Sequence, residues 1–409
     1  MYGKIIVILL ALLGASFPIL LNVFKRKSAK NEIPDNVRDV YDGESYAKWR
    51  SYHAEHSRLD LISGIVTLIV TVALLATNCF SAFASLFPDV FAWQIISVLL
   101  LDTLVSQVIG TVFSYISTMK IEQKYGFNKS TVKTFVMDKI RELILSLIFA
   151  FAIAFLLAEL HTWLGDALII LLVVVLFLFS LLISFLYPVL SRIGNKFTPL
   201  EDGELRTKLM DLLTSHGYRV RDIKVMDASR RTTKLNAYIT GLGVSKTIVL
   251  FDNLVKVMTT EEICAVFAHE LGHGLHKDVL KSQVMNVGNF LLMAVAAWIS
   301  VRELALHQAF GFEELNYGFA YVLMGVFLSL VQPLTSLLIN FYSRKAEYRA
   351  DAQAVSEGYG EAMVNALKKL AKENFSELAP TRISVLLEYS HPPLSDRIRA
   401  VEELLQAKE

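Results

Sequence analysis

The stretch Phe267–Lys277, FAHELGHGLHK, is the part of the sequence around which the rest of the chain is organised. It contains His269, Glu270 and His273 in the pattern H-E-x-x-H. Two histidines four residues apart on a helix face the same side and can hold one zinc ion between them. Glu270 then lies beside the metal, where it can take a proton from a water whose pKa the zinc lowers towards neutrality. The motif therefore predicts hydrolysis of peptide bonds. Because so short a pattern can also occur by chance, this prediction needs support from the surrounding sequence.

The composition is that of a membrane protein. The 409 residues are 54% hydrophobic and 19% charged, and the mean hydropathy is +0.47, which is too apolar for an ordinary soluble enzyme. No basic patch with interleaved aromatic residues indicates nucleic acid binding. The two cysteines, Cys79 and Cys264, provide neither a disulfide framework nor a cysteine-based zinc site. We therefore expect a polytopic membrane protein that does not bind nucleic acid.

Seven apolar runs without Lys or Arg are each expected to form a helix that crosses the hydrocarbon core. The basic residues Lys25–Lys27 follow the first run, which favours a retained span over a cleaved signal peptide. Alternate threading from an outside N-terminus places almost all basic residues inside, so the zinc motif is predicted to face the cytoplasm. Asp102 lies inside the third run and predicts that the helices enclose water. The runs are Ile5–Phe24, Leu61–Phe87, Ala92–Ser117, Leu143–Leu160, Leu164–Leu190, Val284–Val301 and Tyr317–Phe341.

The polar segments between the apolar runs are expected to form two cytoplasmic loops and a small α+β domain. The loops are Lys25–Asp60 and Thr118–Glu142. Thr259 and Glu262, three residues apart, are typical of a capping box at the start of the motif helix. Before it we expect an amphipathic helix and short strands, at Leu205–Leu213, Ile223–Met226, Leu235–Thr240 and Thr247–Phe251. The chain is thus divided into membrane spans one to five (1–190), a zinc-protease domain (191–283), spans six and seven (284–341) and a C-terminal part that completes the zinc site (342–409).

A zinc hydrolase needs three protein ligands and one open position, so the two histidines require a partner. The metzincin continuation places a histidine six residues after His273, where this chain has Val279, and that class is excluded. His276 is a less suitable third ligand, because a polar residue at the end of a helix is explained by its favourable interaction with the helix dipole. Glu347 is the stronger candidate, because the sixth run leaves from the motif and the seventh returns to Glu347 at the same membrane face. Asp351, four residues on, would fix the tautomer of a ligand histidine. Without the zinc motif, this pair would be read as an ordinary charged helix.

Several further stretches match the pattern of one family. They are Leu235–Gly241 (LNAYITG), Ile248–Asp252 (IVLFD), Tyr389–Ile398 (YSHPPLSDRI) and Tyr125–Asn128 (YGFN). With the zinc motif, the Glu347 and Asp351 pair and the seven spans, they make nearly the whole chain resemble the type I CAAX prenyl proteases. These are integral-membrane zinc metalloproteases that trim the C-termini of farnesylated proteins.

The resemblance implies a mainly α-helical fold, with seven transmembrane helices around a water-filled chamber and a gluzincin-like zinc domain on its cytoplasmic face. It implies one zinc ion per chain, held by His269, His273 and Glu347, and removal of the C-terminal tripeptide from farnesylated CAAX substrates. An extended substrate would lie along the edge strand at Asn236, Ala237 and Tyr238. His391 and Arg397 would stabilise the oxyanion or hold the substrate.

Structural roles for these residues remain open: Asn236 as a turn residue, His391 as a loop brace, and Arg397 paired to Asp396 or Glu347. The stretch His53–His56 resembles a metal pair, but a solvated face of a loop is the preferred interpretation. We expect a monomer, in the endoplasmic reticulum membrane of a eukaryote or the plasma membrane of a bacterium. The alternative functions are a quality-control zinc protease without prenyl specificity, a non-catalytic scaffold and a transporter.

Overall fold

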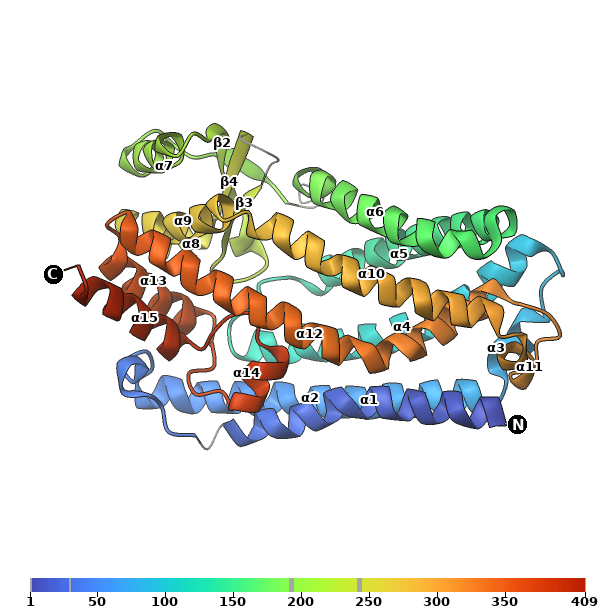
Figure 1. Cartoon of the computed structure of the whole chain (residues 1–409). Helices are drawn as coiled ribbons and strands as arrows, with labels where there is room; N and C mark the ends of the chain where they lie inside the picture. The colour runs from blue at the N-terminus through green and yellow to red at the C-terminus, as the bar shows by residue number, and fades with distance from the viewer. Residues whose placement is uncertain (1, 29–30, 191–194, 241–244, 409) are drawn as a thin grey trace.

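Long helices running side by side make up most of the computed structural model, which describes residues 2–28, 31–190, 195–240 and 245–408 (Figure 1). Within these residues, six helical stretches are long and apolar enough to cross a membrane: α1 (Tyr2–Ser28), α2 (Gly43–Ala76), α4 (Phe91–Tyr115) with η2 (Ile116–Glu122), α5 (Val132–Leu164) with η3 (Gly165–Ala167), α10 (Asp278–Arg302) and α12 (Tyr317–Ser356). The fifth predicted run forms α6 (Leu168–Leu190), which contains the shorter apolar stretch Leu171–Ile183. All seven predicted runs are therefore mainly helical, and the second is interrupted after Ala76.

The second helix differs from its prediction at both ends. It begins at Gly43, because the Asp42 side chain accepts a hydrogen bond from Ser45 N at 2.7 Å, so much of the predicted first loop is helix. It ends at Ala76 because Asn78 has φ +56°, and the short helix α3 (Cys79–Ala84) follows. The predicted loop around His53 is wrong, since this residue lies on α2 and its Nε2 contacts Phe375 O at 2.8 Å.

The motif helix α9 (Thr260–Leu275) begins with the predicted capping box. Glu262 Oε2 accepts from Thr259 N at 2.8 Å, and Thr259 Oγ1 accepts from Glu262 N at 3.3 Å. Lys277, at φ +55°, separates α9 from α10. The chain returns through α11 (Leu304–Ala309) and α12, which continues without interruption past the predicted span to Ser356. One helix thus carries both the seventh span and Glu347.

A four-stranded sheet lies beside α9 at one end of the bundle (Figure 1). Its strands are β1 (Phe197–Pro199), β2 (Arg219–Met226), β3 (Ala237–Thr240) and β4 (Ser245–Phe251), in the order β1-β2-β4-β3. β3 pairs antiparallel with β4 and forms an edge of the sheet. The helices η4 (Ala228–Arg230), α7 (Glu204–Ser215) and α8 (Asp252–Val257) complete this region. The predicted strands are confirmed. Gly241 and residues 191–194, which follow the predicted domain boundary at residue 190, lie outside the described residues.

One hydrophobic core joins α9 to the C-terminal helices α13 (Gly360–Glu373) and α15 (Leu394–Gln406) and to residues near η1 (Asp35–Val37). Helix α14 (Arg382–Glu388) packs against α12 and α1 (Figure 1). Gly272 on α9 lies so close to α12 that an added Cβ would stand 2.8 Å from Ala350 Cα. The backbones of the two helices that carry the zinc motif and Glu347 are therefore in close contact, which fixes the distance between them.

Two cavities lie along the inside of this arrangement. The first, of about 920 Å³, is lined by Asn236, His391 and Arg397 together with residues of α1 and α2. The second, of about 1040 Å³, lies between α1, α2 and α12, and Asp102 is among its lining residues. Asp102 therefore borders a cavity between the helices.

Candidate active site

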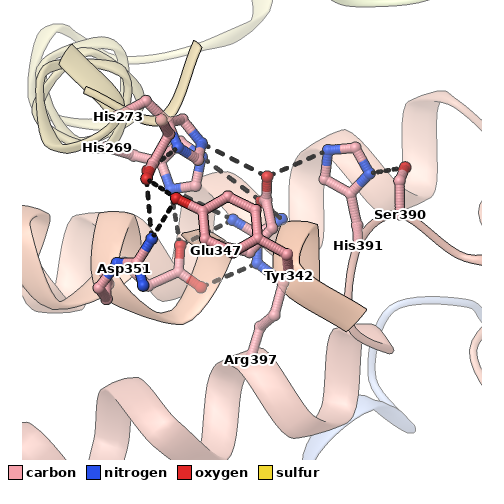
Figure 2. Close-up of polar contacts among 10 residues, drawn as sticks. His269, His273, Tyr342, Glu347, Asp351, Ser390, His391 and Arg397 are labelled. Carbon is pink, nitrogen blue, oxygen red and sulfur yellow. Dashed lines mark hydrogen bonds and ion pairs between the residues drawn. The ribbon is translucent and has the colours of Figure 1, made fainter. Parts of the chain in front are cut away.

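His269 and His273 on α9 point towards Glu347 on α12 (Figure 2). His269 Nε2 lies 3.5 Å from Glu347 Oε2, and His273 Nε2 lies 3.4 Å from Glu347 Oε1. One ligand atom from each of the three residues lies within 4.8 Å of the others. Residues separated by more than seventy positions meet because α10 and α12 lead away from the motif helix and back.

These donors fit a tetrahedral metal ion. With metal–ligand bonds of about 2.0–2.1 Å, neighbouring ligand atoms of a tetrahedron are about 3.3 Å apart. The two histidine–glutamate distances of 3.5 and 3.4 Å, which involve different oxygens of Glu347, are close to this value. Glu347 is 5% exposed, and its buried Oε2 makes no hydrogen bond within the described residues. Such an atom is costly to bury unless another partner satisfies it. Two imidazoles and one carboxylate, whose Oε2 makes no hydrogen bond among the residues described and has Arg397 Nη1 at 3.3 Å, are the chemistry expected of a catalytic zinc site.

Each histidine has a carboxylate behind it. His269 Nδ1 lies 2.8 Å from Asp351 Oδ1, as expected from the sequence, and His273 Nδ1 lies 3.1 Å from Asp278 Oδ2. These contacts place the proton on Nδ1, so both Nε2 lone pairs are directed at the same point. Asp278 was missed as a site residue because the sequence shows it only as a charge flanking the motif.

Asp278 is itself held by two donors from α12. Tyr342 Oη donates to Asp278 Oδ1 at 2.9 Å, and Arg349 Nη2 donates to the same oxygen at 2.8 Å. The orientation of His273 is therefore set by a network that reaches across both ligand helices.

Arg397 on α15 is engaged by carboxylates. Its Nε and Nη2 donate to Asp351 Oδ2 and Oδ1 at 2.8 and 2.7 Å, and its Nη1 lies 3.3 Å from Glu347 Oε2. The side chain is 12% exposed. Of the two structural alternatives, pairing with Glu347 is observed, whereas Asp396 pairs with Arg399. Arg397 therefore holds the carboxylates of the ligand helix in place.

His391 takes a different position. Its Nε2 lies 3.3 Å from Glu347 Oε1, its Nδ1 lies 2.9 Å from Ser390 Oγ, and its side chain is 61% exposed (Figure 2). It also lines the first cavity. A ring that faces the cavity beside the metal ligands is available to a bound substrate.

The electrostatics of the motif helix reflect its surroundings. Burial raises the pKa of the Glu270 carboxyl, and the neighbouring His269 and His273 act in the opposite direction. Burial lowers the pKa of His273, but the carboxylates of Glu347 and Asp278 outweigh this effect and raise it to about 9. A proton on His273 competes with a metal ion for the same nitrogen.

The predicted substrate strand borders the same cavity. Asn236 is exposed, and its Oδ1 accepts a hydrogen bond from Ala237 N at 2.9 Å. Ala237 and Tyr238 begin the edge strand β3, opposite Leu250 and Val249 of β4. Just before them, the Asn374 side chain bonds both backbone groups of Leu235, accepting from its N at 2.8 Å and donating to its O at 3.2 Å. Asn374 was missed because nothing in its local sequence shows this long-range contact.

Two family models together cover most of the chain. The model of peptidase family M48 matches residues 199–405, and a model described as CAAX prenyl protease N-terminal, five membrane helices, matches residues 23–192. The first contains the zinc motif, Glu347, His391 and Arg397. The second covers the second to fifth predicted spans and begins at the end of the first.

Similar proteins include the CAAX prenyl protease 1 homolog of Oryza sativa subsp. japonica, 31% identical over 96% of this chain and 96% of that protein. The CAAX prenyl protease 1 of Saccharomyces cerevisiae is 28% identical over 94% of this chain and 91% of its own length. The probable CAAX prenyl protease 1 of Schizosaccharomyces pombe is 36% identical over 73% of this chain, and the match spans 64% of that protein.

The crystal structure of S. mikatae Ste24p superposes with a TM-score of 0.91 at 28% sequence identity, covering 98% of this chain and 99% of that chain. The agreement therefore extends to the membrane helices as well as the zinc domain. Family models, full-length relatives and structure lead to the same conclusion. The chain belongs to peptidase family M48, as a multi-pass membrane metalloendopeptidase whose N-terminal helices match those of CAAX prenyl proteases.

Proposed function

We propose that this protein is a zinc-dependent endopeptidase that removes the C-terminal tripeptide from prenylated CAAX proteins. The observation that carries the proposal is the convergence of His269, His273 and Glu347 on one point. His391 and Arg397, which contact Glu347, line a cavity of about 920 Å³ beside this point. Support for the substrate comes from relatives that match this chain over nearly their full length. Their names describe CAAX prenyl proteases.

Substrate would bind by adding a strand to the sheet. β3 has β4 on one side only, and Asn236 at its start lines the cavity. An extended peptide can pair with such an edge through its backbone, which leaves its side chains to determine specificity. We assign Asn236, Ala237 and Tyr238 to this contact.

Zinc bound by the two histidines and Glu347 would polarise the scissile carbonyl and lower the pKa of a water molecule at the open position. Glu270 removes a proton from the attacking water and delivers it to the leaving amine. The exposed His391 donates a hydrogen bond to the developing oxyanion. Arg397 acts as a positioning residue, because its contacts are with Asp351 and Glu347.

The zinc end is proposed to face the cytoplasm. The basic residues in the last turn of α1, including Lys25 and Arg26, line the same cavity as His391 and Arg397, as expected for the cytoplasmic side of a membrane protein. The membrane would be that of the endoplasmic reticulum in a eukaryote or the plasma membrane in a bacterium. All three ligands come from one chain, so a monomer is sufficient for activity.

The test is mass spectrometry of a farnesylated C-terminal CAAX peptide incubated with the purified protein, with its unprenylated twin as the control. Release of the intact tripeptide from the farnesylated peptide alone is expected. Equal cleavage of both peptides, with cleavage of a misfolded membrane protein, would favour a quality-control protease instead. A scaffold or a transporter would release no tripeptide, and transport would not depend on a zinc chelator.

A further inference from the structure

The first cavity is lined by basic residues besides those that contact the zinc ligands. Arg26 on α1 and Arg50 on α2 both line it, as do His391 and Arg397 next to Glu347. Both arginines are exposed, and neither has a hydrogen-bond or ion-pair partner among the residues that the structure describes. The cavity thus holds two guanidinium groups that have no anionic partner among the described residues. This feature needs an explanation.

The two arginines lie near one another on adjacent helices. Ser57 Oγ on α2 donates to Asn22 Oδ1 on α1 at 2.8 Å, and the helices run in opposite directions (Figure 1). Arg26 is one turn beyond Asn22, and Arg50 is two turns before Ser57, so both extend past this contact in the same direction. They form one basic patch on the cavity wall, which we call the Arg26–Arg50 patch.

The other charged groups of the cavity do not neutralise this patch. Glu388 pairs with Lys25 at 2.8 Å. Glu377 keeps its charge, because its hydrogen-bond donor is the neutral Tyr389 Oη, but it forms no ion pair with Arg26 or Arg50 among the described residues. Asp60 is ten residues beyond Arg50 on the same helix, about 15 Å along its axis. The patch is therefore positive and open to a ligand in the cavity.

We infer that the Arg26–Arg50 patch binds the free C-terminal carboxylate of the peptide substrate. The inference rests on the proposed function, in which three residues follow the scissile bond. Three extended residues carry their carboxylate about 10 Å from that bond, away from the metal and into the cavity. Arginine is suited to this ligand because its planar fork donates two parallel hydrogen bonds to a carboxylate. Such a subsite would select substrates that end shortly after the scissile bond.

The experiment compares two farnesylated CAAX peptides, one with a free C-terminal carboxylate and one with a carboxamide, on the full-length protein. The wild type is expected to cleave the carboxylate peptide about tenfold or more better in kcat/KM, the size expected for hydrogen bonds to a charged group. Arg50→Gln and Arg26→Gln should each reduce this preference through KM, and the double variant should abolish it. Cleavage of the carboxamide peptide should stay unchanged.

Arg58→Gln is the matched control, because Arg58 is an exposed arginine on the same helix that does not line the cavity. Bound zinc in each variant reports whether the site is still folded. Equal cleavage of the two peptides by the wild type overturns the inference. So does an equal loss on both peptides in the variants, as expected if the patch held lipid phosphates instead. A wild type that cleaves neither peptide overturns the proposed function itself.

Discussion

Replacing Asp351 by asparagine tests whether the carboxylate behind His269 sets the metal site. The exchange preserves shape and removes the charge from a residue that is 1% exposed and accepts three hydrogen bonds, one from His269 and two from Arg397. An asparagine offers one acceptor oxygen, and its NH₂ group faces the donors of the other partner. In one orientation the asparagine faces His269 with its NH₂ group, and the contact that fixes the Nδ1 proton is lost; in the other it faces Arg397 Nε. In both, Glu347 at 3.3 Å is the remaining carboxylate beside Arg397.

Loss of a carboxylate behind a ligand histidine typically weakens metal binding 10- to 100-fold, so we expect a decrease of about this size. Breaking a buried ion pair lowers the free energy of unfolding by about 3–5 kcal/mol. Because the Arg397–Glu347 contact remains, we expect a loss at the lower end of this range, about 3 kcal/mol. Zinc affinity is measured by competition with a chelator, and stability by thermal unfolding in detergent. Cleavage at saturating zinc shows how much of the lost activity comes from lost metal.

Glu262→Gln is the matched control, because Glu262 is a buried carboxylate on the same helix α9, paired with Lys369 at 2.7 Å far from the ligands. It should lower stability and leave zinc affinity unchanged. If Asp351→Asn binds zinc as tightly as the wild type, the assigned role of Asp351 is refuted.

Three further predictions follow from the packing and the metal site. Gly272→Ala should destabilise the protein by about 1–3 kcal/mol and weaken zinc binding, because the new methyl group would press on Ala350 and shift α12; unchanged unfolding and zinc affinity would contradict this. Thr259→Ala should lower stability by about 1 kcal/mol through loss of the capping box, with kcat unaffected once the protein is folded. Treatment with a zinc chelator should abolish cleavage, and added zinc should restore it; activity that survives complete metal removal would exclude the zinc mechanism.

Much of the site follows from local sequence patterns. The spacing of His269 and His273, the Thr259 and Glu262 cap and the positions of Glu347 and Asp351 all depend on helical periodicity, which short sequences display. The structure brings these residues together because α10 leads away from the motif helix and α12 leads back to it. Both helices contain a span of the same membrane, and the thickness of the membrane sets the length of each span. The edge strand was likewise indicated by its β-branched and aromatic residues.

Other features depend on contacts that no local pattern displays. Asp278 meets His273 only because Lys277 takes a positive φ and turns the chain between α9 and α10. Asn374 reaches Leu235 from the end of α13, and the first turns of α2 place Trp49 in the core that also contains residues of the C-terminal helices. The bidentate contact between Arg397 and Asp351 was missed because Asp396 and Glu347 were the candidate partners drawn from the sequence.

The most direct test of the zinc-protease mechanism is Glu270→Gln, assayed for bound zinc by elemental analysis and for tripeptide release from a farnesylated peptide. Glu270 is not among the residues that converge on the metal position, so zinc should remain at one ion per chain. Cleavage should fall by about 10²-fold or more, because the general base is lost. Full cleavage by the zinc-loaded variant would contradict the central claim that Glu270 activates the water at this site.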